Sequence, residues 1–330
     1  MRWRSGFFPS LACLAVLLAA GNAPAQDSSQ LVTAAAASGR PRECAPKSRS
    51  ASNDWHVNLW DGAKQPQLRR YCDLLGRARV RLSTAPGLAR EAASLADQVL
   101  PGHAAPWVLR ARANVLLGDF AQAVQDFEHA RSIDARSVEE PLSIYDLAGA
   151  LRRSGNRTAA LAAYRILLTR LSLLPSPEMR LRALLESASL AMSTGEQGLP
   201  EAVAILSEAA QQPLSRYSDD VHSMLLLAVD RAGQADRGAA AEEHFQRSGV
   251  AEAFARRDLS TFDYLDDPQD ALALLAIAVE RTAPSSATSF WDRFIKAAPH
   301  SPFLAHAKRH QDTLRKAPRT PPNRLPRRTP

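Results

Sequence analysis

The sequence lacks the short motifs that mark common enzyme classes. It contains no G-x-S-x-G, no G-x-x-x-x-G-K, no H-E-x-x-H, and no G-x-G-x-x-G placed between a strand and a helix. These absences leave no nucleophile elbow, phosphate loop or zinc-protease site to assign. We therefore expect a non-enzymatic protein without a cofactor, and an enzyme with an unrecognised site is the remote alternative.

Long hydrophobic runs are also absent, because no apolar stretch approaches the roughly 20 residues that a membrane-spanning helix needs. The apolar residues 11–20 follow Arg2 and Arg4 and are followed by Ala-Pro-Ala at 23–25. This order is typical of a secretory signal peptide cleaved before Gln26. The sequence predicts a periplasmic mature protein without a transmembrane segment, and an extracellular location is the alternative.

Cysteine is scarce, and Cys13 lies inside the predicted signal peptide. Cys44 and Cys72 remain, in a compartment that permits disulfides. We predict that these two residues form a structural disulfide. The alternative is that Cys72, which falls on the apolar stripe of an expected helix, is a small buried core residue.

Basic charge is concentrated at the two ends of the chain. The formal net charge is +7, but it is +1 for the chain without residues 1–25 and 317–330. Nucleic-acid binding needs Lys and Arg gathered on one folded face, so we expect none. Residues 317–330 contain five prolines and predict a disordered tail, either solvated or in contact with an acidic surface such as anionic lipid. Arginine outnumbers lysine 36 to 5, which is typical of GC-rich bacterial genomes.

What the sequence does contain is helical periodicity. Apolar residues recur at three-to-four spacing in residues 104–117 and again in residues 120–132, which predicts two amphipathic helices. Gly118 is expected to end the first helix in a left-handed conformation, and Asp119 is expected to cap the second. Two helices joined this tightly form an antiparallel hairpin.

This hairpin resembles the tetratricopeptide repeat. Counting from Ala104 as position one, the signature positions 4, 8, 15, 20, 24 and 27 of that family are Trp107, Ala111, Gly118, Ala123, Phe127 and Ala130. The resemblance implies an all-α fold, a right-handed superhelical solenoid of antiparallel helix hairpins. It also implies an adaptor or scaffold for protein–protein interaction.

The pattern recurs, with decay, around Gly155, Gly195 and Gly233. Successive glycines are 37, 40 and 38 residues apart, longer than the 34 residues of the family, so other helical repeats near 40 residues remain an alternative for the weaker units. Further helices are expected to start near residues 267, 285 and 301. The expected organisation is a signal peptide at 1–25, a flexible segment at 26–52, a helical repeat domain at 53–316 and the tail at 317–330.

The resemblance also implies a binding groove, because the first helix of each hairpin faces the ligand in this family. The groove positions of the family correspond here to Arg112, Tyr145, Asp146, Arg152, Arg153 and Glu186. The expected partner is a peptide or helix of an unidentified protein in the bacterial cell envelope. The alternative is a structural subunit of an envelope assembly, held by its convex face and basic tail.

Two clusters raise the question of a metal ion. His306 and His310 lie four residues apart on an expected helix, but the sequence offers no third ligand, so we expect a solvated helix face and no metal. Asp263, Asp266, Asp267 and Asp270 precede another expected helix. They lack the alternate acidic positions, glycine and final glutamate of a calcium loop, so we expect helix capping.

Overall fold

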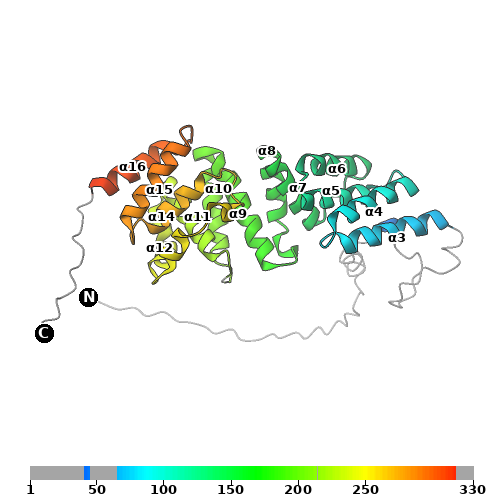
Figure 1. Cartoon of the computed structure of the whole chain (residues 1–330), viewed down its shortest axis with the longest axis horizontal. Coiled ribbons are helices and arrows are strands. Elements are labelled where there is room, and N and C mark those ends of the chain that lie inside the picture. Colours follow the sequence, from blue (N-terminus) through cyan, green and yellow to red (C-terminus); the bar gives the residue numbers. More distant parts are fainter. Residues whose placement is uncertain (1–40, 45–64, 214, 317–330) are drawn as a thin grey trace, which may run out of the picture. The chain divides into compact units, whose positions relative to one another are not determined.

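The computed structural model describes residues 41–44, 65–213 and 215–316. The chain divides into two units, Met1–Asp61 and Gly62–Pro330. In the first unit the only described element is a short 3-10 helix, η1 (Arg42–Cys44). The described residues of the second unit form fourteen α-helices, α3 to α16, and no strand (Figure 1). The predicted all-α class is therefore confirmed, whereas the predicted signal peptide and the tail lie outside the described residues.

The first eight helices pair in chain order. The pairs are α3 (Pro66–Arg81) with α4 (Pro86–Val99), α5 (Ala104–Leu117) with α6 (Phe120–Ile133), α7 (Pro141–Arg153) with α8 (Arg157–Leu168), and α9 (Pro177–Ser193) with α10 (Leu199–Ala209). Each pair also contacts the next one, so consecutive hairpins are stacked (Figure 1). This sequential packing is compatible with an α-solenoid.

The C-terminal half departs from simple pairing. α11 (Ser218–Arg231) is followed by two short helices, α12 (Ala239–Gln246) and α13 (Val250–Ala255), and by the 3-10 helix η5 (Leu259–Phe262). The chain then returns with α14 (Asp270–Val279), which packs against α11. α15 (Pro284–Ala297) and α16 (Leu304–Lys316) complete the stack, and all three helices begin within three residues of the expected starts. Three more 3-10 helices are η2 (Leu171–Leu173), η3 (Gly195–Gly198) and η4 (Ala235–Gly238).

Glycine closes the first helix of the hairpins, as the sequence predicts. The φ angles of Gly118, Gly155, Gly195 and Gly233 are +81°, +85°, +82° and +66°. These angles lie in the left-handed region, which glycine enters without a Cβ penalty.

The expected cap at Asp119 is not formed. Asp119 stands directly before α6, but its exposed side chain accepts no hydrogen bond from the backbone. At the equivalent corner of the next hairpin, Asn156 does accept one from the N–H of Ala159, at 3.3 Å. The corner at Asp119 is open to solvent, where water can bind the first N–H groups of α6.

Small and aromatic residues fill the space between the helices. Ala111, Ala123, Phe127 and Ala130 have no exposed surface, and Trp107 is partly buried against the same core. The alanines allow the helices to approach closely, and the phenylalanine fills the gap between hairpins. The expected core positions of the best-preserved hairpin are therefore confirmed.

Cys44 and Cys72 are disulfide-bonded, which confirms the predicted pair. None of the helices in the described ranges combines the length and the apolar character needed to cross a membrane.

Candidate functional site

The predicted groove residues lie on α5, α7 and α9, each the first helix of its hairpin. We call the side of these helices that carries Arg112, Arg152 and Glu186 the inner face. On α5, Arg112 donates a hydrogen bond from Nε to Oδ2 of Asp146 on α7, at 2.8 Å. Both side chains are 16% exposed. Burial raises the pKa of the Asp146 carboxyl, and the Arg112 charge and hydrogen bond oppose that rise. The two residues are 34 positions apart in sequence and join consecutive hairpins.

One repeat further along, Arg152 of α7 is paired with Glu186 of α9. Nη2 of Arg152 lies 3.1 Å from Oε1 of Glu186, and both side chains are buried. Glu186 also accepts hydrogen bonds from the Tyr164 hydroxyl, at 2.6 Å, and from Nε of Arg182, at 3.2 Å. Tyr145 lies close by, and burial followed by the charge of Glu186 raises the pKa of its hydroxyl.

The chain itself occupies the inner face at this point. Residues 258–267, which we call the strap, cross α7, α9 and α11. Arg152 donates to the carbonyl of Leu265 at 3.0 Å and to the carbonyl of Asp263 at 3.2 Å. Arg182 binds the Asp263 carboxylate at 2.7 Å. The N–H of Asp266 donates to Oγ of Ser189 on α9, also at 2.7 Å.

Buried aromatic residues hold the strap in place. Tyr264 has no exposed surface, and its hydroxyl donates to Oδ1 of Asp220 on α11, at 2.8 Å. Arg257 donates to the same oxygen at 2.8 Å, and its guanidinium lies 4.6 Å from the ring centroid of the buried Phe262. Burial raises the pKa of Asp220, and the Arg257 charge opposes this. Arg152, at a position expected to face a partner, thus faces the strap, and Glu186 is buried against Arg152, Arg182 and Tyr164.

Arg153 is separate from the other predicted groove residues. Its side chain is exposed, and its guanidinium lies 4.9 Å from the ring centroid of Phe120, on the second helix of the preceding hairpin. Leu116 of α5, one turn beyond Arg112, is 55% exposed. Arg112 and Leu116 thus remain on a part of the inner face with which the strap makes no hydrogen bond or ion pair.

Of the four aspartates at and before the start of α14, only one forms a local cap. Asp267 accepts a hydrogen bond from the N–H of Gln269 at 2.9 Å, which fits local capping. The other three make no capping hydrogen bond and pair instead with arginines distant in sequence, although Asp270 does lie in the first turn of α14, where an acidic residue is favourable. The pairs are Asp263 with Arg182 at 2.7 Å, Asp266 with Arg157 at 2.7 Å, and Asp270 with Arg231 at 2.6 Å. Sequence spacing does not show such partners, because only the fold brings them together.

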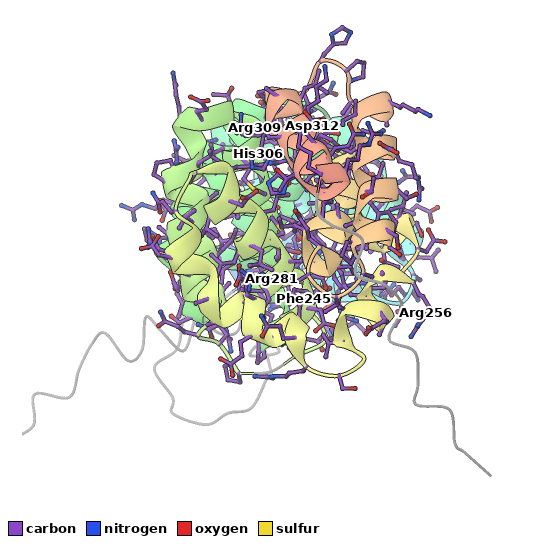
Figure 2. All side chains as sticks on the ribbon, turned by 90° about the vertical axis from the view of Figure 1, so that its left-hand side faces the viewer. Phe245, Arg256, Arg281, His306, Arg309 and Asp312 are labelled. Atoms are coloured by element: carbon purple, nitrogen blue, oxygen red, sulfur yellow. The ribbon has the colours of Figure 1, made fainter. Side chains whose placement is uncertain are left out.

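The expectation of a solvated face at His306 and His310 is also wrong. His306 is only 8% exposed, and its Nε2 lies 2.6 Å from Oδ2 of Asp230 on α11. Nε2 of His310 lies 2.9 Å from the same oxygen. The Trp291 ring on α15 is stacked on the His310 ring, with centroids 5.1 Å apart. The exposed side of α16 is formed instead by residues such as Arg309 and Asp312 (Figure 2).

A second carboxylate lies behind His310. Glu280, directly after α14, is hydrogen-bonded to Nδ1 of His310 at 2.9 and 3.0 Å. Burial alone would lower the pKa of His310, but the carboxylates of Asp230 and Glu280 raise it to about 9. Burial would raise the pKa of Asp230, and the two imidazoles hold it below its ordinary value. The sequence could not show this cluster, since its members lie on α11, after α14 and on α16.

A pocket of about 220 Å³ adjoins this cluster. Its polar wall includes Asp230, Glu280 and His310, and its apolar wall includes Phe245 and Ile277. Phe245 and Arg281, which both line this pocket, are labelled close to each other in Figure 2. No family model matches the sequence, and no curated protein matches it either.

Proposed function

We propose that this chain is a non-enzymatic adaptor of the bacterial cell envelope, which binds a peptide segment or helix of a partner protein on its inner face. Stacked helix hairpins present an extended surface, and proteins built this way serve chiefly as binding scaffolds. Membership of the tetratricopeptide family and a right-handed superhelix are parts of this proposal. The disulfide between Cys44 and Cys72 supports an exported protein, because such bonds persist in oxidising compartments.

The strap is the observation that carries the proposal. It is a segment without α-helix that is bound across α7, α9 and α11, and Arg152 holds it by main-chain carbonyls that any peptide possesses. Arg182 adds a contact to an acidic side chain, and Tyr264 fills the core as an apolar anchor. The inner face therefore has the chemistry to hold a non-helical peptide with acidic and aromatic residues.

A partner would bind on the neighbouring part of the inner face. Arg112 and Leu116 lie one turn apart on α5, so both present side chains to the same side of the helix. Tyr145 on α7 is partly buried and offers an aromatic surface. Arg152 and Glu186 take no part in this contact, since the strap and their own ion pair occupy them.

The proposal is tested by affinity capture from the envelope fraction with Leu116→Asp. The matched control is Ile166→Asp, because Ile166 is 54% exposed but lies on α8, the second helix of its hairpin. We expect Leu116→Asp to reduce recovery of the partner at least tenfold and Ile166→Asp to leave it unchanged. Equal recovery with both variants would contradict binding on the inner face.

A further inference from the structure

Three potential metal ligands converge where α16 meets α11. They are Oδ2 of Asp230, Nε2 of His306 and Nε2 of His310, and these atoms lie within 4.8 Å of one another. His306 and His310 share one side of α16 because they are four residues apart. Asp230 shares α11 with Asp220, which binds the strap, but α5, which carries Arg112 and Leu116, contributes no ligand. The cluster is therefore separate from the proposed partner contact.

The carboxylate at the centre of this cluster has an unsatisfied oxygen. Oδ2 of Asp230 is buried and accepts no hydrogen bond, although both imidazole Nε2 atoms lie within 2.9 Å of it. Two imidazole nitrogens thus crowd one carboxylate oxygen without forming a regular hydrogen bond to it, which is uncommon for a buried polar atom. A cation between the oxygen and the two nitrogens would satisfy it.

Glu280 orients one of these ligands. Its carboxylate binds Nδ1 of His310, so Nε2 of the same ring points toward Asp230. Nε2 is then the nitrogen placed to bind an ion. Metal-binding histidines in proteins nearly always have such a partner on the second nitrogen, because it fixes the ring and its tautomer.

The donor set favours zinc. Two imidazoles and one carboxylate suit Zn²⁺, whereas Ca²⁺ and Mg²⁺ prefer sites made of oxygen atoms alone. Ligand atoms around a tetrahedral zinc ion are about 3.3 Å apart, since each bond is about 2 Å long. The contacts of 2.6 and 2.9 Å to Asp230 would therefore widen by less than about 1 Å. The adjoining pocket leaves room for water as the fourth ligand.

We propose that Asp230, His306 and His310 form a zinc site that fastens the last helix, α16, to α11. Glu280 is a positioning residue, because it acts through His310 rather than on the ion. Zinc replaces the contacts between one carboxylate and two imidazoles with bonds that join α11 to α16, two helices far apart in sequence. The site thereby stabilises the C-terminal end of the helical stack.

A second histidine pair serves as an internal control. His222 and His244 are stacked with ring centroids 4.1 Å apart, and Nε2 of His244 contacts Asp219 at 2.7 Å. Nδ1 of His222, in contrast, is bound to the carbonyl of Ser218. Here the two rings do not share a carboxylate, so this cluster should not bind the ion.

The test is a zinc titration of the metal-free mature chain by calorimetry, with Co²⁺ as a spectroscopic substitute. We expect one Zn²⁺ per chain and a Co²⁺ spectrum of tetrahedral intensity. His306→Gln, His310→Gln and Asp230→Asn should each weaken zinc binding at least 100-fold, and Glu280→Gln should weaken it 10- to 100-fold. His244→Gln should leave the affinity unchanged.

Two results would overturn the proposal. One is an unmodified chain that binds no zinc at micromolar concentration, a measurement that no variant's folding can affect. The other is unchanged affinity in both His306→Gln and His310→Gln, with far-UV circular dichroism confirming that they are folded. Zinc should also raise the Tm of the unmodified chain, and no rise at saturating zinc would exclude the fastening role.

Discussion

Nη2 of Arg152 lies 3.1 Å from Oε1 of Glu186, and the same guanidinium binds two carbonyls of the strap. One arginine therefore joins two hairpins and a segment more than 100 residues later in the chain. Arg152→Ala would leave the Glu186 carboxylate buried beside fewer donors.

We expect Arg152→Ala to lower the free energy of unfolding by about 3–5 kcal/mol, the effect of breaking a buried ion pair by removing one partner. Urea unfolding followed by circular dichroism measures it. The neighbouring Arg153→Ala is the control, because Arg153 is exposed and only stacks on Phe120, a contact of about 1 kcal/mol or less. Similar losses in the two variants would contradict the buried network.

Two glycine substitutions should change the free energy of unfolding in opposite directions. Gly118→Ala forces a side chain into a φ of +81° and should destabilise the chain by about 1–2 kcal/mol. Gly76→Ala lies within α3, where an added Cβ meets no atom within 4 Å, and should stabilise it by up to about 1 kcal/mol. Urea midpoints compare the two directly, and equal shifts would refute the turn geometry.

Removing the disulfide should destabilise the chain. Replacing Cys44 and Cys72 together by serine frees the loop that they close in the unfolded state, which is worth about 3–4 kcal/mol in the loop-entropy model. The measurement is urea unfolding of both proteins, with and without reductant. Reductant should destabilise only the unmodified chain, and an equal response of both would speak against the bond.

His222 should contribute an acid-side loss of stability. Burial lowers its pKa from 6.5, and the neighbouring His244 and Arg247 act in the same direction, against the Ser218 carbonyl and Asp219. Below pH 6.5 the unfolded ring binds a proton before the folded ring does, so stability falls as the pH drops from about 7 toward the folded-state pKa.

We expect His222→Gln to flatten this dependence, measured as the free energy of unfolding between pH 7 and pH 5. His300→Gln, at an exposed position, is the control and should leave the slope unchanged. A slope in His222→Gln identical to that of the unmodified chain would rule out this residue as the source.

The local features were predictable from sequence, and the distant contacts were not. Gly118 and the buried Phe127 follow from turn chemistry and helical periodicity, which depend on neighbouring residues only. The pairing of Arg152 with the strap and of His306 with Asp230 depends on where the chain between α11 and α14 runs. No periodicity encodes that path, so the occupied part of the groove and the histidine cluster could be found only from the fold.

The strap changes how this chain should unfold. In a simple repeat array each unit contacts only its neighbours, so stability is a sum of local terms and the ends can melt separately. Here a segment after α13 bonds to α7, α9 and α11. In hydrogen exchange, the backbone amides of these helices and of α14 should therefore show the same free energy of opening. The amides of α3 and α4 should show a different one, because these two helices can unfold separately. By joining these helices, the strap makes the hairpins that it contacts one cooperative folding unit.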